Sequence, residues 1–268
     1  MNSIFKNENY IPYEQPKIIY KYRNWEEEFQ KDVLRNNEMY LASPEELNDP
    51  FDLDIFPDFS IIDDNKKLST YVHSLFPECN PSKKNDIIRS LKDNKEELES
   101  GLKEILNNSK NKYYGILCLA HEWNNILMWS HYAKSHKGYC IGFHFEKLKY
   151  LIKKGIGGPI NYNDYYPKIE LDKKAIGRAF DETHTKAKDW MYEKEYRMIV
   201  FDNFDTPKNQ RKLRFTDGTI AEVNIGFNCN NEDKKEIIKI CKNKSNDIKI
   251  FQVVKVKNEF KLSREEII

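Results

Sequence analysis

Short strand patterns and amphipathic helical patterns alternate along this chain without a regular order, and this irregularity limits the folds that it can adopt. In several segments apolar residues alternate with polar ones, whereas in others apolar residues recur three or four positions apart. A strict strand–helix–strand rhythm would indicate a parallel, doubly wound sheet, and this chain has none. The sequence therefore predicts an α+β protein with a central, mostly antiparallel sheet, flanking helices and a helical insertion.

The expected elements cover most of the chain. Strands are expected at residues 17–23, 38–43, 113–120, 139–145, 160–166, 190–200, 213–216, 219–225 and 248–256. Helices are expected at residues 24–36, 64–76, 83–92, 94–107, 124–135, 172–189 and 231–243. The glycine-rich residues 155–159 are expected to form a turn.

The predicted domain organisation is simple. Residues 1–16 are polar, contain two prolines and are expected to form an N-terminal arm. Residues 17–268 are expected to form a single α+β domain. Within it, the lysine-rich residues 60–112 are expected to form a helical insertion over the main sheet. The first residues also lack the apolar segment of a signal peptide.

Composition and charge limit the classes of protein to which this chain can belong. The 268 residues carry 44 Lys and Arg against 43 Asp and Glu, so general binding to polyanions is not expected. The five cysteines form no CxxC pair, which is typical of reduced thiols in a cytoplasmic protein. No apolar run approaches the roughly 18 residues that span a membrane, so no membrane partner is expected.

The segment Trp190–Val200 concentrates charged and aromatic residues. Read as a strand, it places Glu193, Glu195 and Arg197 on one face, with neighbours roughly 6–7 Å apart. Two carboxylates beside a guanidinium can raise the pKa of one carboxylate and bind an anion. The structural alternatives are an exposed strip of ion pairs and a helical turn with Glu193 paired to Arg197.

No familiar cofactor motif is present: the chain has no Walker loop, GxGxxG, GxSxG or HExxH sequence. Cysteines and histidines cluster between residues 118 and 144, but without the paired spacing of zinc ligands, so no metal site is expected. Asp49 and Asp52, with Glu193 and Glu195, could hold Mg²⁺ for phosphodiester hydrolysis.

The Asn48-Asp49-Pro50 sequence supports a structural interpretation of the same region. It favours a turn in which Asn48 and Asp49 bond to nearby backbone, and Phe51 is then expected to be a buried anchor.

Four segments in order resemble a known bacterial family. They are IIYKYR, MYLASPEELNDPFD, NILMWSHYAKSHKGYCIGF and WMYEKEYR. These segments are similar to the family called domain of unknown function 2971, and the resemblance extends from about Ile18 to Leu262. This resemblance implies no activity, because the function of the family is unknown.

The order of polar residues resembles a second group, the ADP-ribosyltransferases. These enzymes carry Arg or His on a first strand, Ser or Tyr on a second, and a catalytic Glu that opens a later strand. The corresponding positions are Lys21 or Arg23, Tyr40 or Ser43, and Glu195. The triplet Glu193–Glu195 resembles the ExE element of the arginine–serine–glutamate branch, which implies a split antiparallel sheet.

The second resemblance implies an ADP-ribosyltransferase-like enzyme that uses NAD. Glu195 would hold the nicotinamide ribose and stabilise an oxocarbenium-like transition state, with little effect on folding when substituted. Glu193 would be its partner, and Arg197 would hold both carboxylates in place. The residues expected to bind NAD are Tyr20, Lys21, Tyr22, Arg23, Tyr40, Ser43, Trp129, His131 and Tyr132.

The expected role is that of a toxin or antiphage defence effector that modifies nucleic acid or protein. One alternative is a non-enzymatic ligand-sensing or interaction module of a bacterial stress or defence system. Another is a metal-dependent nuclease that uses Asp49, Asp52 and Glu195. Hydrolysis of NAD without metal would favour the transferase, and a metal requirement would favour the nuclease.

Overall fold

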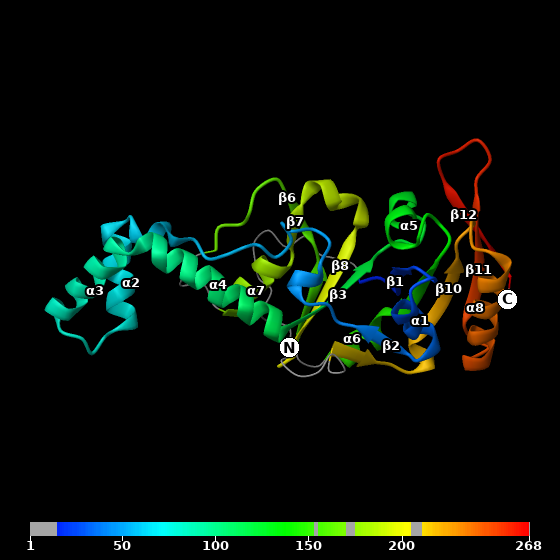
Figure 1. The fold of residues 1–268 in the computed structure, drawn as a ribbon, viewed down its shortest axis with the longest axis horizontal. Coiled ribbons are helices and arrows are strands. Elements are labelled where there is room, and N and C mark those ends of the chain that lie inside the picture. Colours follow the sequence, from blue (N-terminus) through cyan, green and yellow to red (C-terminus); the bar gives the residue numbers. More distant parts are fainter. Residues whose placement is uncertain (1–14, 153–154, 170–174, 205–210, 268) are drawn as a thin grey trace.

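The computed structural model describes residues 15–152, 155–169, 175–204 and 211–267. The predicted N-terminal arm lies almost entirely outside these residues, and the division of the chain into an arm and one domain stays a prediction. The predicted α+β fold with a mostly antiparallel sheet is confirmed, and Figure 1 shows the sheet flanked by helices.

Eight strands form the central sheet. In the order of their hydrogen bonding they are β12 (Leu262–Glu266), β11 (Lys249–Lys255), β10 (Ile220–Ile225), β4 (Tyr139–His144), β1 (Ile18–Arg23), β3 (Tyr114–Ala120), β8 (Glu195–Phe201) and β5 (Gly155–Pro159). Only the β10–β11 pair is parallel within this sheet of the described residues. Two small sheets pair β2 (Glu38–Tyr40) with β9 (Lys212–Arg214), and β6 (Asn161–Asn163) with β7 (Thr185–Ala187).

Helices cover both faces of the sheet. α1 (Glu28–Arg35), α6 (Phe145–Leu151) and α8 (Asn231–Lys244) bury Leu34, Leu148 and Ile237 in one large cluster with the inward residues of β4 and β10. On the opposite face, α5 (Ile126–Tyr132) buries Met128 and Trp129 against Tyr20 and Tyr22 of β1. The sequence of β1 predicts Tyr20 and Tyr22 on one face and Ile19 on the other. This alternation is confirmed, because Ile19 belongs to the first cluster and the two tyrosines to the second.

The predicted helices of residues 60–112 form an extension of the molecule. They are α2 (Asn65–Leu75), α3 (Pro81–Asp93) and α4 (Lys95–Tyr113). In Figure 1, α2 and α3 lie at the far left, away from the sheet, and α4 leads back to β3. Phe59, Ile62, Leu68 and Val72 form a separate small core there.

The sheet opens between β1 and β3. These strands pair only through Tyr20 and Ala120, whereas β1 pairs with β4 along its whole length. Where β1 has diverged, Ala42 takes its place beside β3 and exchanges two backbone hydrogen bonds with Ile116, of 2.9 and 2.8 Å. The split of the sheet that the ADP-ribosyltransferase resemblance implies stays a prediction.

Three local predictions were wrong. Residues 155–159 form strand β5 rather than a turn, because glycine lets this backbone lie close to β8: a Cβ on Gly155 would lie 2.1 Å from the carbonyl oxygen of Ile199. The strand expected at 190–200 begins at Glu195, since Lys188–Glu193 forms a 3₁₀ helix that ends at Lys194 with a φ of 43°. The apolar spacing of residues 24–36 predicts Phe29 on one stripe with Val33 and Leu34, but Phe29 is 60% exposed.

Several other elements differ from expectation. The helix expected at 172–189 is described as α7 (Ala175–Thr183), with residues 170–174 outside the description, and β7 follows it. Strand β12 was not predicted, because its charged residues lack an alternating apolar pattern.

We expect Gly138→Ala to destabilise the fold. Gly138 lies between α5 and β4, and a Cβ there would lie 2.0 Å from the carbonyl oxygen of Arg23. Crowding of this kind costs about 1–3 kcal/mol of unfolding free energy. Gly101→Ala is the matched control, because nothing lies within 4 Å of its added Cβ in helix α4. The control should gain about 0.5–1 kcal/mol from its higher helix propensity.

Urea unfolding followed by circular dichroism measures both variants beside the parent. Equal effects of the two substitutions would contradict the close approach of Gly138 to β1.

Candidate functional site

A cavity of about 460 Å³ occupies the opening between β1 and β3. Its walls include Tyr20–Arg23 of β1, Cys118 of β3, and side chains from the segments around Tyr40, Tyr132 and Glu193. The volume falls in the range of roughly 300–1,000 Å³ that is typical of small-molecule sites. The divergence of the two strands therefore provides a space in which a ligand can bind.

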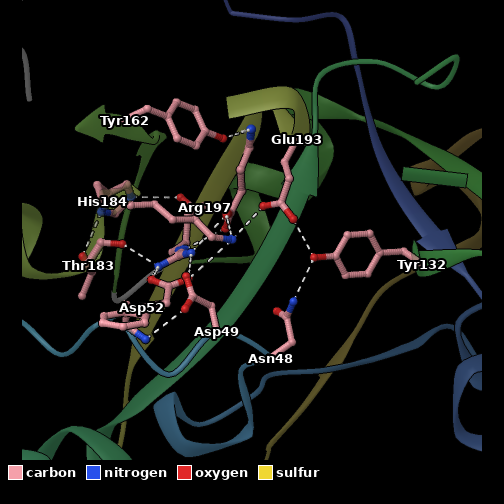
Figure 2. A network of polar contacts seen from close by, with 12 residues as sticks. Asn48, Asp49, Asp52, Tyr132, Tyr162, Thr183, His184, Glu193 and Arg197 are labelled. Atoms are coloured by element: carbon pink, nitrogen blue, oxygen red, sulfur yellow. Dashed lines mark hydrogen bonds and ion pairs between the residues drawn. The ribbon is translucent and has the colours of Figure 1, made fainter. Parts of the chain in front are cut away.

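Arg197 is the centre of a buried ion-pair network beside this cavity, which Figure 2 shows from close by. Its Nη1 and Nη2 donate to the two carboxylate oxygens of Asp52 at 2.8 and 2.7 Å. Its Nε and Nη2 donate to those of Glu195 at 2.7 and 3.0 Å. The guanidinium is fully buried, so these two bidentate pairs offset the cost of its desolvation.

Lys186 of β7 provides the second positive charge of the network. Its Nζ lies 2.7 Å from Glu193, 3.3 Å from Glu195 and 3.6 Å from Asp52, measured to a carboxylate oxygen of each. Its amine also lies 4.8 Å from the centre of the Trp190 ring. Three carboxyl groups thus share two cations.

Neutral groups from other elements position the two glutamates. The Tyr132 hydroxyl of α5 donates to Glu193 at 2.5 Å and accepts from Asn48 at 3.3 Å. The backbone N–H of Glu195 donates to the Tyr162 hydroxyl at 2.9 Å. Contacts from α5, β6 and the loop after β2 therefore hold the start of β8 in place (Figure 2).

The pKa values of the two glutamates are shifted from the ordinary glutamate value in opposite directions. Burial raises the pKa of Glu193 above its ordinary value, and the charge of Glu195 adds to this effect although Lys186 opposes it. Burial also acts to raise the pKa of Glu195, but Arg197 and Lys186 outweigh it and hold this pKa well below the ordinary range. Glu195 is therefore held ionised, whereas Glu193 is the carboxylate suited to exchange a proton.

Two cations of β1 lie on the cavity wall without acidic partners in the described part of the chain. Lys21 Nζ donates to the carbonyl oxygen of Cys118 at 2.8 Å, and the buried Nε of Arg23 has no hydrogen-bond partner. Burial lowers the pKa of Lys21 to about 7 and that of Arg23 to about 10. An unpaired guanidinium beside a cavity is a binding group for an anion.

The cavity brings together most of the residues that the sequence singles out. It is lined by Tyr20, Lys21, Tyr22, Arg23, Tyr40, Tyr132, Glu193 and Glu195. Phe29, which was not proposed for the site, also lines it, and so do Asp52 and Lys186.

Four of the predicted site residues lie elsewhere. Arg197 is fully buried and holds Glu195, as expected, but it pairs with Asp52 rather than with Glu193. Ser43 is buried and donates to Glu46 at 3.0 Å, as the cap of a short helix. Trp129 is fully buried against Tyr22 and donates to the carbonyl oxygen of Trp123. His131 is exposed at the end of α5 and is not part of the cavity wall.

The loop after β2 agrees only in part with the turn chemistry expected of it. Asp49 accepts from the backbone N–H of Phe51 at 3.0 Å, which confirms the predicted turn. Asn48 instead donates to the Tyr132 hydroxyl, and Phe51 is 67% exposed, so the predicted anchor was wrong. Asp52 points inward in its place, because the buried Arg197 requires a charged partner.

Lys186 is a member of the charged network that sequence analysis missed. It falls in a stretch expected to be an amphipathic helix, where a lysine indicates the exposed face. The structure ends that helix at Thr183 and buries Lys186 on β7. No local sequence signal distinguishes a buried lysine of this kind from an exposed one.

The carboxylates at the cavity are engaged by cations of the chain. Among the residues that the structure describes, no group of three or more His, Cys, Asp and Glu side chains is arranged to hold a metal ion. Asp52, Glu193 and Glu195 already pair with Arg197 or Lys186.

The comparisons with known proteins agree with one of the two resemblances. Residues 128–198 match the family described as "Protein of unknown function (DUF2971)", which supports the family expected from the sequence over this segment. The matched segment begins in α5 and ends in β8, so it contains Tyr132, Lys186, Glu193, Glu195 and Arg197. No curated protein and no solved structure matches the chain.

The helices were also compared with the requirements of a bilayer. In the described ranges, no helix combines the length and the apolar character needed to cross a membrane.

We expect Arg197→Met to lower the free energy of unfolding by about 3–5 kcal/mol, because it leaves Asp52 and Glu195 buried without their main partner. Arg214→Met is the matched control. Arg214 is also a strand arginine paired with a glutamate, Glu38, but its side chain is 79% exposed. An exposed pair contributes about 0–1 kcal/mol. Similar losses in urea unfolding for both variants would refute a dominant role for the buried network.

Glu195 is expected to stabilise the fold in a pH-dependent way, contrary to the small effect on folding that the sequence suggested. Its folded pKa lies below the ordinary value of about 4.3. The contribution of ionised Glu195 to the free energy of unfolding is therefore complete above about pH 4.3. It is lost as the pH falls from there towards the folded pKa.

We expect Glu195→Gln to lower the free energy of unfolding by about 1–3 kcal/mol at neutral pH. The difference from the parent should shrink as the pH is lowered below about 4. Urea titrations over this range measure it, and a difference that stays constant would contradict the assigned ionisation.

Proposed function

We propose that this chain is an ADP-ribosyltransferase-like enzyme that binds NAD in the cavity between β1 and β3. The observation that carries the proposal is the arrangement of charge: unpaired cations lie on the β1 wall, and two glutamates open onto the same cavity. A dinucleotide needs both features, because its pyrophosphate is anionic and its reacting ribose becomes cationic.

Arg23 is assigned to the pyrophosphate, since its guanidinium lacks a partner and matches the geometry of phosphate oxygens. Lys21 adds positive charge when it is protonated. Phe29, which is 60% exposed at the cavity, and Tyr40 offer ring faces for a planar base. These groups supply the binding half of the proposed site.

Glu195 and Glu193 are assigned to the reacting ribose. When the bond from ribose to nicotinamide breaks, positive charge develops on the ribose, and a fixed carboxylate charge stabilises it. Arg197 keeps Glu195 ionised in a buried place, so the charge is already present before the reaction. Glu193, with its raised pKa, is assigned to accept the proton of the incoming acceptor.

A second candidate is a ligand-binding module without enzymatic activity. It is favoured by the pairing of Glu195 with two cations, which weakens the field that this carboxylate exerts on a ligand. The role as a toxin or defence effector, and the acceptor in nucleic acid or protein, rest on the resemblance alone.

The test compares NAD binding and NAD consumption in purified variants without added metal. Glu195→Gln should lose about 10²–10³ in rate while NAD binding changes little, because its charge acts mainly in the transition state. Arg23→Gln should instead weaken binding, by about tenfold for one lost charge-assisted contact. Glu146→Gln is the control, since its side chain is 74% exposed on α6.

Calorimetry and nicotinamide release provide the two readouts, and thermal melts correct for the lower stability of Glu195→Gln. Binding without turnover in the parent would select the ligand-binding module. Absence of both would reject the proposal, and so would full activity in Glu195→Gln.

A further inference from the structure

Lys21 has a chemical capacity that NAD binding does not use. Its amine enters the opening between β1 and β3, where its polar contact is the 2.8 Å hydrogen bond to the carbonyl oxygen of Cys118. In the described part of the chain no carboxylate forms an ion pair with it. Lys21 is half-buried and is one of the residues that line the cavity.

The groups that surround this amine favour its uncharged form. Burial has the largest effect on the pKa of Lys21, and the positive charge of Arg23 on the same strand lowers it further. Cys118 on β3 and Glu195 on β8 act in the opposite direction but do not restore the ordinary value. With a pKa of about 7, close to half of the Lys21 amines carry a free electron pair at neutral pH, and such an amine is a nucleophile.

Arg23 supplies the second half of the arrangement. It is two residues beyond Lys21 on β1, so both side chains leave the same face of the strand, roughly 6–7 Å apart. Its Nε is buried without a hydrogen-bond partner. A ligand with an anionic group on Arg23 would therefore place an atom a few bonds away next to the amine of Lys21.

We propose that Lys21 forms a reversible imine with a phosphorylated aldehyde whose phosphate is bound by Arg23. The inference uses the same cavity as the proposed function but does not require that NAD is the natural ligand. It identifies Lys21 as a covalent binding site for carbonyl compounds.

The step is balanced without an oxidant or a reductant. The electron pair of Nζ attacks the carbonyl carbon, a C–N bond forms and the carbonyl π bond breaks onto oxygen. Two protons of the amine leave with that oxygen as water, and the C=N bond remains. Water reverses the step, so the adduct is in equilibrium with the free aldehyde until it is reduced.

The probe for this test is pyridoxal 5′-phosphate, an aldehyde that carries a phosphate, followed by reduction with borohydride. Peptide mass mapping then measures labelling at Lys21 and at the exposed Lys257, which is the internal reference. We expect Lys21 to be labelled at least about tenfold more than Lys257 at limiting probe, because one charge-assisted phosphate contact is worth about that factor. Labelling of Lys21 should also rise with a midpoint near pH 7.

Two variants and a second probe separate the parts of the proposal. Arg23→Gln should reduce labelling of Lys21 by about tenfold with pyridoxal 5′-phosphate and little with pyridoxal, which lacks the phosphate. Lys21→Arg keeps a positive charge but cannot form the imine, so it should abolish the adduct while its thermal melt stays close to that of the parent.

Labelling of Lys21 no greater than that of Lys257 would overturn the proposal. The proposal would also be overturned if the ratio of Lys21 labelling by pyridoxal 5′-phosphate to labelling by pyridoxal were the same in the parent and in Arg23→Gln. Binding and consumption of NAD are measured on the same samples. An imine without NAD binding would reject only the proposed function, and NAD turnover without an imine would reject only this inference.

Discussion

The ion pairs of Arg197 hold together elements that are far apart in the sequence. Its guanidinium is fully buried within β8, and four hydrogen bonds join it to Asp52 of the loop after β2 and to Glu195 of its own strand. Since a buried charge without partners costs several kcal/mol, the loop and the strand are fixed against each other. Lys186 joins the same carboxylates and anchors β7. The acidic side chains lie together at the cavity wall because each buried charge is paired with one of opposite sign.

The opposite wall depends on a break in the hydrogen bonding of the sheet. β1 and β3 pair at Tyr20 and Ala120 and then diverge, which leaves backbone groups of β3 without a neighbouring strand. Ala42 satisfies those of Ile116, and the amine of Lys21 satisfies the carbonyl of Cys118. The Lys21 side chain thus replaces a backbone hydrogen bond between strands, and its amine is therefore buried in a less polar environment than water. The same divergence explains the size of the cavity and the unusual state of Lys21.

Glu193 and Glu195 are the same residue type, but their different surroundings give them different pKa values and therefore different chemical roles. Glu195 lies on β8 between Arg197 and Lys186, so its charge is held but partly neutralised. Glu193 lies in the preceding 3₁₀ helix, where Tyr132 and Lys186 contact it and burial raises its pKa. In the proposed reaction the first acts through a fixed charge and the second through a proton. A carboxylate pair of this kind divides the work in many enzymes, because the two environments move the pKa values apart.

The sequence by itself determined the α+β class, most element positions, the family that residues 128–198 match, and the placement of Tyr20–Arg23, Glu193 and Glu195 around one cavity. These follow from local patterns: alternation along β1, helical periodicity in α8, and charged residues grouped at the start of β8. Only the tertiary structure decided that Asp52 and Lys186 belong to the network, that Phe51 is exposed, and that Ser43, Trp129 and His131 lie outside the cavity. The physical reason is that burial of a charge depends on partners from distant segments, and no local pattern records which lysine or aspartate will meet Arg197.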